Sequence, residues 1–335
     1  MPITRRGLAL GAAALATPAL LSRPADAAEF NWKFATNIPP THPSNAQAQQ
    51  AIDRIREQSG GRMKLTLFPN NQLGGDTDMF SQLRAGAIHL FPISGLIVQT
   101  VVPEAGANGI GWAFKGHDTV WAAMDGDFGP YVRKKIEAAG VHPFEKIWDN
   151  GFRQVTSSRG PIRTPEDMQG FKIRTPVMPI LTFLFESLGA GPSTIDIKEA
   201  YSALQIKLVD GEENPLALID SWKFYEVQKY CSLTNHVWDG LWVLANARAF
   251  NRLPPDLQDI VSRNIDVAAT GQRVDLRKLN DGLQVEIEKQ GMQFNRPDPE
   301  PFRAKLRDAG FYKHWPETFG TELWGLLENY TGKLA

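Results

Sequence analysis

The sequence predicts an α/β protein of two lobes, with a cleft between them and one long helix that spans both. Three observations support this prediction. Strand and helix patterns alternate in a β-α-β-α-β order through the first half, which implies a largely parallel sheet covered by helices. The chain has 335 residues, more than one hydrophobic core usually serves, so two domains are expected. A helical pattern over Pro255–Lys289 is long enough to reach across both.

Strand and helix signals follow one another in the first 95 residues. Apolar residues alternate over 30–37, 63–68 and 88–93, which predicts three strands. Between them, apolar residues at helical spacing predict two helices, the first capped at Ser44 and the second at Asp76. Because the carboxyl ends of parallel strands meet at one edge of the sheet, the loops after these strands are expected to border the cleft.

The second half repeats this style without repeating the sequence. Further strands are predicted over 142–149, 151–157 and 171–174, the first two meeting at a turn at Asn150-Gly151. Helices are predicted over 165–167, over 179–188 and from Asp196 through Leu204. In the long helical pattern, Gly271 and Gly282 are predicted weak points.

The elements are assigned to two lobes after a short N-terminal segment. Lobe I comprises 28–150 together with about 237–270, and lobe II comprises 151–236 together with about 271–335. The chain therefore crosses between the lobes more than once. Such an arrangement leaves a cleft between the lobes, at the carboxyl ends of the strands.

Residues 1–27 have the composition of a bacterial export signal. Arg5 and Arg6 lie in a basic stretch, an apolar run follows from Leu8 to Leu21, and Ala25-Asp26-Ala27 offers small residues for cleavage. The paired arginines favour the twin-arginine route. The apolar run is shorter than the roughly 20 residues that cross a bilayer, and no cysteine follows it for lipid attachment. We therefore expect a mature chain that begins near Ala28, is not inserted in the membrane and resides in the periplasm.

Composition excludes several classes of protein. The net charge of −1 gives no electrostatic case for nucleic acid or an anionic membrane surface. Cys231 is the single cysteine, so it forms no intramolecular disulfide and is predicted to be a small buried side chain. The six histidines show neither a metal-ligand repeat nor a serine-nucleophile context. We therefore expect a binding protein that is not an enzyme and holds no cofactor or metal.

Two segments carry the chemistry for holding a carboxylate. Arg174 ends a short predicted strand, and Thr175-Pro176 stiffens the exit from it. Asn214 lies on a turn within Asp210–Pro215. A guanidinium matches a carboxylate with two parallel hydrogen bonds, and an amide both donates and accepts. One such charged bond contributes roughly 1.5–3 kcal/mol, whereas micromolar binding needs about 8 kcal/mol. Closure of the lobes around the ligand is expected to supply much of the rest.

Six motifs stand in a characteristic order and spacing. They are SGGR at 59–62, FPNNQLG at 68–74, LRAGA at 83–87, GFRQVT at 151–156, EDMQGFKIRTP at 166–176 and VDGEENP at 209–215. Together they resemble the solute-binding proteins of TRAP-type (tripartite ATP-independent periplasmic) transporters, the C4-dicarboxylate-binding periplasmic receptor family. The resemblance covers nearly the whole mature chain.

The resemblance implies a periplasmic binding protein fold that closes on a small organic acid and delivers it to a membrane permease driven by an ion gradient. It implies that Arg174 pairs with the ligand carboxylate, that Arg153 is a second ligand-facing arginine and that Asn214 supplies an amide. The family also uses the loop after the first strand and the end of the third, here Asn37 to His42 and Ser94-Gly95. Whether Glu213 helps to hold a cation beside the carboxylate stays open.

One departure from the family pattern bears on the ligand. A glycine-rich segment precedes Trp112 where many relatives have a Pro-Phe-leading aromatic segment, and Trp238 and Trp242 follow a predicted crossing of the chain. If these indoles wall the cleft, they suit an aromatic or other bulky monocarboxylate, which we rank slightly ahead of a C4-dicarboxylate or a sugar acid. Indoles packed away from the cleft would remove the basis for that ranking. A receptor for an ABC importer or for a sensor system remains the alternative function.

Overall fold

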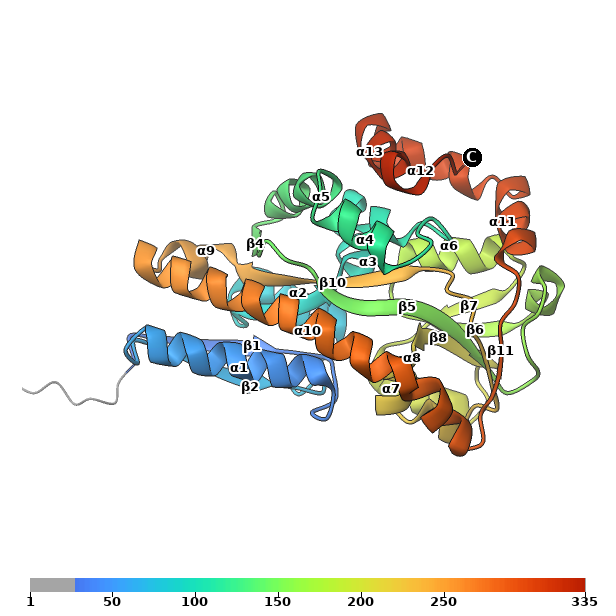
Figure 1. Cartoon of the computed structure of the whole chain (residues 1–335), viewed down its shortest axis with the longest axis horizontal. Coiled ribbons are helices and arrows are strands. Elements are labelled where there is room, and N and C mark those ends of the chain that lie inside the picture. The colour runs from blue at the N-terminus through green and yellow to red at the C-terminus, as the bar shows by residue number, and fades with distance from the viewer. Residues whose placement is uncertain (1–27, 335) are drawn as a thin grey trace, which may run out of the picture.

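The computed structural model describes residues 28–334, which form one mixed sheet of 11 strands with helices on both of its faces (Figure 1). The strands are β1 (Phe30–Ala35), β2 (Met63–Phe68), β3 (Leu90–Ser94), β4 (Val141–Pro143), β5 (Trp148–Ser157), β6 (Lys172–Thr175), β7 (Gly191–Thr194), β8 (Gly211–Pro215), β9 (Tyr230–Ser232), β10 (Trp238–Asn246) and β11 (Gln293–Asn295). The predicted export signal at 1–27 lies outside the described residues.

The helices alternate with these strands for most of the chain. They are α1 (Pro43–Gln58), α2 (Asp76–Ala85), α3 (Gly95–Val98), α4 (His117–Met124), α5 (Phe128–Glu137), α6 (Pro179–Ser187), α7 (Ile197–Gln205), α8 (Leu216–Ser221), α9 (Ala247–Asn251), α10 (Pro255–Lys289), α11 (Pro299–Asp308), α12 (Phe311–Phe319) and α13 (Thr321–Thr331). Three short 3-10 helices are η1 (Pro103–Gly109), η2 (Pro165–Met168) and η3 (Phe224–Glu226).

The order of the strands explains the two lobes. Along the sheet they run β2-β1-β3-β10-β5-β8-β6-β7. At one end β1 pairs in parallel with β2 and β3, and at the other β6 pairs in parallel with β7 and β8. The long antiparallel pair β10 and β5 joins these two parallel sections and lies in the middle of the molecule (Figure 1). This arrangement confirms the predicted two-lobed α/β fold. In such a fold, a ligand-binding site is expected where the two parallel sections of the sheet face each other.

Helix α10 spans the molecule as the sequence predicted. Its 35 residues run unbroken past both predicted weak points. Near its start, Leu257 and Val261 pack in the core that contains β1 and α1, whereas Leu283 and Ile287 pack in the core that contains α7. Figure 1 shows α10 running beside α1 at one end and α8 at the other. The helix is stabilised by these two separate cores, because packing of an apolar face outweighs the helix-weakening effect of glycine.

Four local predictions were wrong. Asn214 lies on strand β8 and not on a turn. Residues 142–157 do not contain two strands meeting at Asn150-Gly151; β5 continues through both residues because Gly151 adopts φ +106° and an irregularity opposite Asp239 absorbs the mismatch. Helix α1 is capped by His42, whose Nδ1 accepts from the Ser44 amide at 3.2 Å. Helix α2 is capped at Gly75, so Asp76 is its first residue.

The C-terminal helices pack over other helices of the molecule. Helix α13 packs against α4 and α5, and Figure 1 shows α12 and α13 above this helical layer. Our division of the chain into lobes, including 271–335 in lobe II, stays a prediction. Cys231 is fully buried in the core that contains α7, as predicted.

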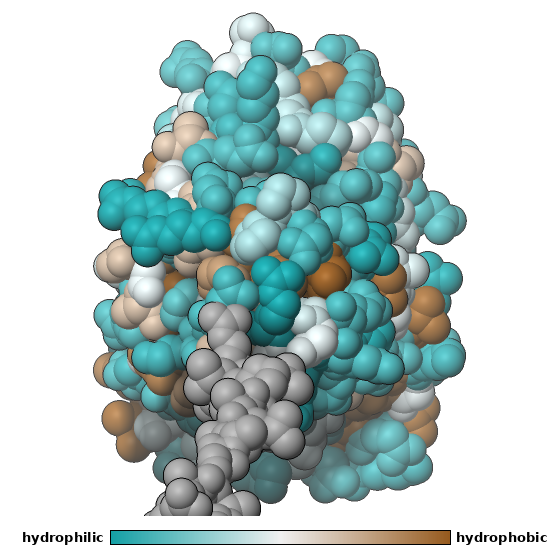
Figure 2. All heavy atoms as spheres, turned by 90° about the vertical axis from the view of Figure 1, so that its left-hand side faces the viewer, coloured by the Kyte–Doolittle hydropathy of each residue, from teal (hydrophilic) through white to brown (hydrophobic). Residues whose placement is uncertain are grey.

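The surface is mainly polar on the face that carries α1 and α9. Figure 2 shows this face with hydrophilic side chains predominating and apolar ones scattered among them. Within residues 28–334, no helix is both long enough and apolar enough to cross a bilayer.

Candidate functional site

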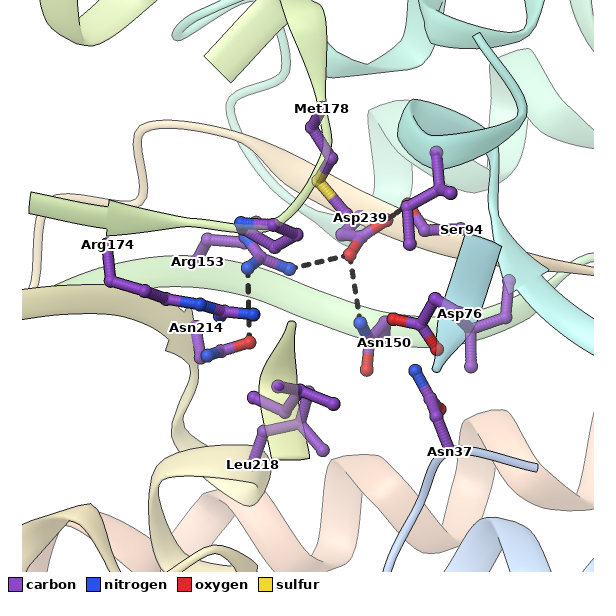
Figure 3. A pocket seen from close by; sticks show the side chains of 14 residues that line it. Asn37, Asp76, Ser94, Asn150, Arg153, Arg174, Met178, Asn214, Leu218 and Asp239 are labelled. Carbon is purple, nitrogen blue, oxygen red and sulfur yellow. Dashed lines mark hydrogen bonds and ion pairs between the residues drawn. The ribbon is translucent and has the colours of Figure 1, made fainter. Parts of the chain in front are cut away.

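A small cavity lies where the two parallel sections of the sheet face each other (Figure 3). Its empty volume, which includes space open to solvent, is ≈ 380 Å³. The lining residues are Asn37, Asp76, Ser94, Ile97, Asn150, Arg153, Arg174, Pro176, Met178, Ile197, Asn214, Leu218, Asp239 and Leu241.

Arg174 lines the cavity with a charged group that makes few hydrogen bonds to the rest of the protein. It is the third residue of β6 and is fully buried. Its Nε donates to the carbonyl of Ile195 at 2.7 Å, but Nη1 and Nη2 have no hydrogen-bond partner within residues 28–334. Burial lowers the pKa of Arg174, and the charges of Glu212 and Glu213 oppose that shift. A buried guanidinium with two free donors is costly unless an anion meets it.

Asn214 stands beside Arg174 on the neighbouring strand β8, where the amide is held by both of its polar atoms (Figure 3). Its Oδ1 accepts from Arg153 Nη2 at 3.1 Å, and its Nδ2 donates to Glu212 Oε2 at 2.5 Å. Glu212 also accepts from the Thr156 hydroxyl at 2.8 Å. Burial raises the pKa of Glu212 to about 7. The amide is thus fixed in orientation at the cavity wall.

Arg153, on β5, is surrounded by acceptors. Its Nη2 donates to Glu213 Oε1 at 2.8 Å and its Nη1 to Asp239 Oδ2 at 2.7 Å, while Nε also meets the Glu213 carboxylate. Burial alone would lower the pKa of Arg153, but the attraction of Glu213 and Asp239 raises it. His236 completes this group, with Nε2 3.2 Å from Glu213 Oε2. Most of the hydrogen-bonding capacity of Arg153 is therefore used inside the protein.

The network continues along the wall from Arg153 toward α3. Asp239 accepts from the Ser94 hydroxyl at 2.5 Å and from Asn150 Nδ2 at 2.9 Å (Figure 3). The same hydroxyl accepts from the amide of Leu96 at 3.1 Å and so begins α3. Burial raises the pKa of Asp239, and Arg153 opposes the shift. The predicted residue Ser94 thus lines the cavity through a fixed chain of hydrogen bonds.

Asp76 lies on the far side of the cavity from Arg174, with the amide of Asn37 pointing toward it (Figure 3). It is 7% exposed, and its Oδ1 has no hydrogen-bond partner among the described residues. Burial raises the pKa of Asp76 to about 7; the charge of Asp196 adds to this shift, and the Asn37 amide and Arg174 oppose it. Asp76 is therefore a second polar group with a buried atom, Oδ1, that has no hydrogen-bond partner among the described residues.

Five of the predicted site residues come together at this cavity. They are Arg174, Asn214, Arg153, Asn37 and Ser94. Two other predicted residues lie outside its lining. His42 is buried as the cap of α1, where burial lowers its pKa to about 4. Gly95 is enclosed by α3 and η1, since a Cβ on it would lie 2.6 Å from the Ala105 carbonyl oxygen.

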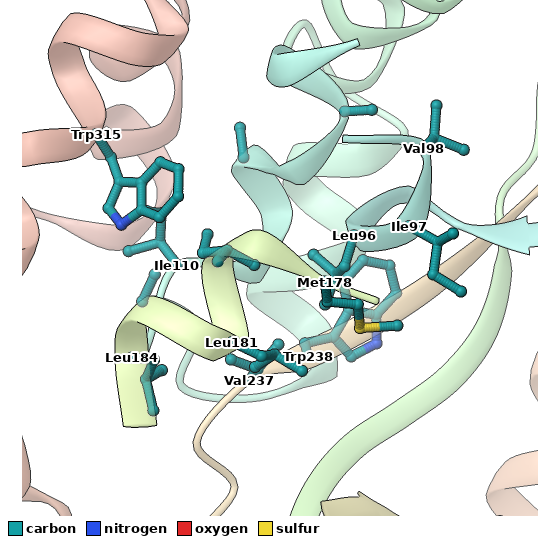
Figure 4. Packing of buried hydrophobic residues seen from close by; sticks show 14 of the residues in the cluster. Leu96, Ile97, Val98, Ile110, Met178, Leu181, Leu184, Val237, Trp238 and Trp315 are labelled. Carbon is teal, nitrogen blue, oxygen red and sulfur yellow. The ribbon is translucent and has the colours of Figure 1, made fainter. Parts of the chain in front are cut away.

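The predicted aromatic residues lie away from the cavity lining. Trp112 donates from Nε1 to the Thr234 carbonyl at 2.9 Å and packs on Phe302, with ring centroids 5.4 Å apart. Trp238 donates from Nε1 to Asp149 at 2.9 Å and packs in the apolar cluster around α3 and α6 (Figure 4). Trp242 is fully buried on β10. Within the described part of the chain, no aromatic side chain lines the cavity, which removes the basis for ranking an aromatic acid first.

Sequence reasoning missed three polar lining residues. Asp76 was assigned only to begin a helix, although its position after Gly74-Gly75 marks a tight approach of the backbone. Asn150 was assigned to a turn. Asp239 offered no local signal, because its role depends on Arg153, which lies 86 positions away in the sequence.

Comparison with known proteins adds independent information. The model of a family described as bacterial extracellular solute-binding protein, family 7, matches residues 34–311. An uncharacterised protein, y4mM, of Sinorhizobium fredii is 37% identical over 76% of the chain; the match spans about half, 47%, of that relative's length.

Two solved structures are similar over almost their whole length. A TRAP periplasmic solute-binding protein from Sulfurospirillum deleyianum with bound succinate has a TM-score of 0.84 and 27% identity, and the match covers 91% of this chain and 99% of that one. One from Polaromonas sp. JS666 bound to D-erythronate has a TM-score of 0.85 and 27% identity, with the same 91% and 99% coverage. Both likenesses confirm the two-lobed fold.

Proposed function

We propose that this chain, which belongs to family 7 of the bacterial extracellular solute-binding proteins, captures a small organic acid in the cavity between its lobes. The observation that carries the proposal is Arg174, a fully buried arginine whose two terminal nitrogens have no partner among the described residues. A ligand carboxylate that meets both nitrogens forms the bidentate pair for which a guanidinium is suited. Asn214 stands beside it as a fixed amide.

The lining supports a small polar acid over an aromatic one. Beside the polar groups, its side chains are aliphatic, together with Met178 and Pro176. The two solved relatives hold succinate and D-erythronate, each an anion of four carbons. We therefore place a C4-dicarboxylate or a sugar acid ahead of the aromatic monocarboxylate. The remaining predicted contacts, His42, Gly95, Trp112 and Trp238, would need a different state of the site to reach a ligand.

Binding is proposed to be coupled to closure of the lobes. Residues from both parallel sections of the sheet line the cavity, so a ligand that contacts both sides at once needs the lobes together. The acid enters when the lobes are apart, and it shifts the population toward the closed state because only that state surrounds it. The receptor is proposed to act in the periplasm and to deliver the acid to a TRAP-type membrane permease driven by an ion gradient.

A ligand screen tests the proposal. The protein would be isolated from the periplasm of a host that expresses the full chain, then unfolded and refolded to remove any bound acid. Thermal shifts would be recorded with aliphatic, hydroxy-, dicarboxylic and aromatic acids. A midpoint that rises with ligand concentration for one class of acid is expected, and Arg174→Ala should abolish the rise.

Arg263→Ala is the matched control for that variant. Arg263 lies on α10, paired with Asp259, and its side chain is 60% exposed. This variant removes the same charge at an exposed position outside the cavity lining and should leave the ligand-induced shift intact. A shift that persists in Arg174→Ala would contradict the role proposed for Arg174. Uptake that stops when the ion gradient collapses, and not when ATP is depleted, would support the proposed permease.

A further inference from the structure

The cavity has opposite chemistry on its two sides. Arg174 presents hydrogen-bond donors from β6, whereas Asp76 presents a carboxyl group from the start of α2 (Figure 3). Asp76 Oδ1 is buried without a hydrogen-bond partner within residues 28–334. A buried acceptor of this kind favours any ligand group that donates a hydrogen bond to it.

A second carboxylate from another helix stands close to Asp76. Asp196 caps α7 through Oδ1, which accepts from the Lys198 amide at 3.1 Å, and its Oδ2 accepts from the Asp76 amide at 3.1 Å. This approach needs glycine at position 75, where a Cβ would lie 2.3 Å from Asp196 Oδ2. The side of the cavity formed by α2 and α7 therefore already concentrates negative charge.

We propose that Asp76 is a specificity-determining residue that selects a hydroxylated monocarboxylate over a dicarboxylate of the same length. With the ligand carboxylate on Arg174, a hydroxyl group at the other end donates to Asp76. A second carboxylate at that end would instead face Asp76, with Asp196 behind it. Like charges held close together with little water between them repel strongly. The inference rests on the proposed function, because it takes Arg174 as the group that holds the carboxylate.

The fold itself does not choose between the two ligand classes. Structures with bound succinate and with bound D-erythronate match this chain equally well, at 27% identity each. Both anions have a chain of four carbons, so they differ in whether the far end carries a charge or hydroxyl groups. Any preference between them must therefore come from the side chains at that end of the cavity.

Three acids of four carbons separate the effect of the ligand's hydroxyl groups from the effect of a second negative charge. Calorimetric titration at pH 8, where Asp76 is ionised, would compare D-erythronate, butanoate and succinate on the refolded protein. D-erythronate should bind most tightly, with succinate and butanoate each weaker by about tenfold or more, because a site that binds a hydroxyl rejects analogues that lack it. Butanoate reports the loss of the hydroxyl groups alone, and succinate adds the second charge.

Asp76→Asn tests the residue directly. The amide keeps the size of the side chain but removes its charge, so the preference for D-erythronate over succinate should fall about tenfold. Asp78→Asn is the matched control, since Asp78 is exposed two positions further along α2 and lies outside the cavity lining. It should leave the preference unchanged.

Each result of these titrations either supports or overturns the role proposed for Asp76. Succinate binding as tightly as D-erythronate, or an unchanged preference in Asp76→Asn, overturns the inference. If all three acids bind equally and all lose affinity in Arg174→Ala, the proposed function stands while the role of Asp76 falls. If no carboxylic acid binds the protein, the proposed function and this inference fail together.

Discussion

Two arginines line the same cavity and are equally buried, yet the protein uses them in different ways. Arg153 is 1% exposed and Arg174 is 0% exposed. Arg153 donates to Glu213, Asp239 and Asn214, so its charge joins β5, β8 and β10. Arg174 makes one hydrogen bond, from Nε to a backbone carbonyl, and its terminal nitrogens remain without partners among the described residues.

This difference teaches that burial does not by itself identify a ligand-binding arginine. A buried charge is tolerated when it is paired and hydrogen-bonded, and it destabilises the protein when it is not. Arg153 satisfies that condition internally, and we expect its main effect to be on the positions of its neighbours. Arg174 does not satisfy it within the described residues, which is why we propose that a ligand carboxylate pairs with it. The four predictions below test this contrast, from the largest expected effect to the smallest.

Loss of Arg153 should mainly affect stability. Arg153→Ala would leave Glu213 and Asp239 buried without their cation, so the free energy of unfolding should fall by about 3–5 kcal/mol. Urea denaturation without ligand measures this free energy. The control is Arg263→Ala, which breaks an exposed ion pair and should change the free energy of unfolding by less than about 1 kcal/mol. A fall for Arg153→Ala no larger than that of the control would show that the ion pairs contribute little.

Replacement of the guanidinium at position 174 should mainly affect binding. Arg174→Lys keeps a positive charge but loses the planar fork, so the dissociation constant for the best acid should rise roughly 100-fold, about 2.7 kcal/mol. Unfolding without ligand should change much less than for Arg153→Ala, because fewer internal hydrogen bonds are lost. Titration calorimetry and denaturation on the same samples measure both quantities. Normal affinity in Arg174→Lys would mean that charge alone is sufficient.

Asp76 extends the contrast to a buried acid whose Oδ1 has no hydrogen-bond partner among the described residues. Its pKa is raised to about 7 in the folded protein, so between pH 5 and 7 the folded state holds a proton that the unfolded state has released. Stability should therefore decrease as pH rises through this window, by about 2 kcal/mol for this group alone. Burial is the main cause of the raised pKa; the charges of Asp196 and Asp239 add to the shift, and the Asn37 amide and the charge of Arg174 oppose it.

The pH series has its own control. Melting points recorded at pH 5, 6, 7 and 8 should decline less in Asp76→Asn than in the natural protein, while Asp78→Asn should follow the natural protein. Glu212, whose pKa burial raises to about 7, leaves part of the decline in place. An identical decline in Asp76→Asn would mean that Asp76 does not hold this proton.

The smallest effect is expected at Trp112. Trp112→Phe removes the hydrogen bond from Nε1 to the Thr234 carbonyl, which should lower the free energy of unfolding by about 1 kcal/mol. Affinity for the acid should change less than twofold, because Trp112 does not line the cavity. Paired denaturation and titration experiments measure the two effects. A tenfold loss of affinity would restore Trp112 as part of the ligand site.

Local patterns in the sequence predicted much of the architecture correctly. Alternating apolar residues predicted β2 at the bounds that the structure has, and helical periodicity predicted α10 with both of its ends. The cap of α7 at Asp196 was also predicted; in the structure its carboxylate accepts from the Lys198 amide. These features depend on residues within a few positions of one another, so a single sequence contains the information that determines them.

The same distinction between local and long-range information applies to the site. Motif context selected Arg174 and Asn214 for the cavity, and the structure brings both to its lining. The sequence could not show that Arg153 is neutralised by Glu213 and Asp239, which lie 60 and 86 positions away. Nor could it show that Asp76 stands against Asp196, 120 positions further on. Which charges are paired depends on contacts between distant strands and helices, and those contacts exist only once the sheet and the two lobes have assembled.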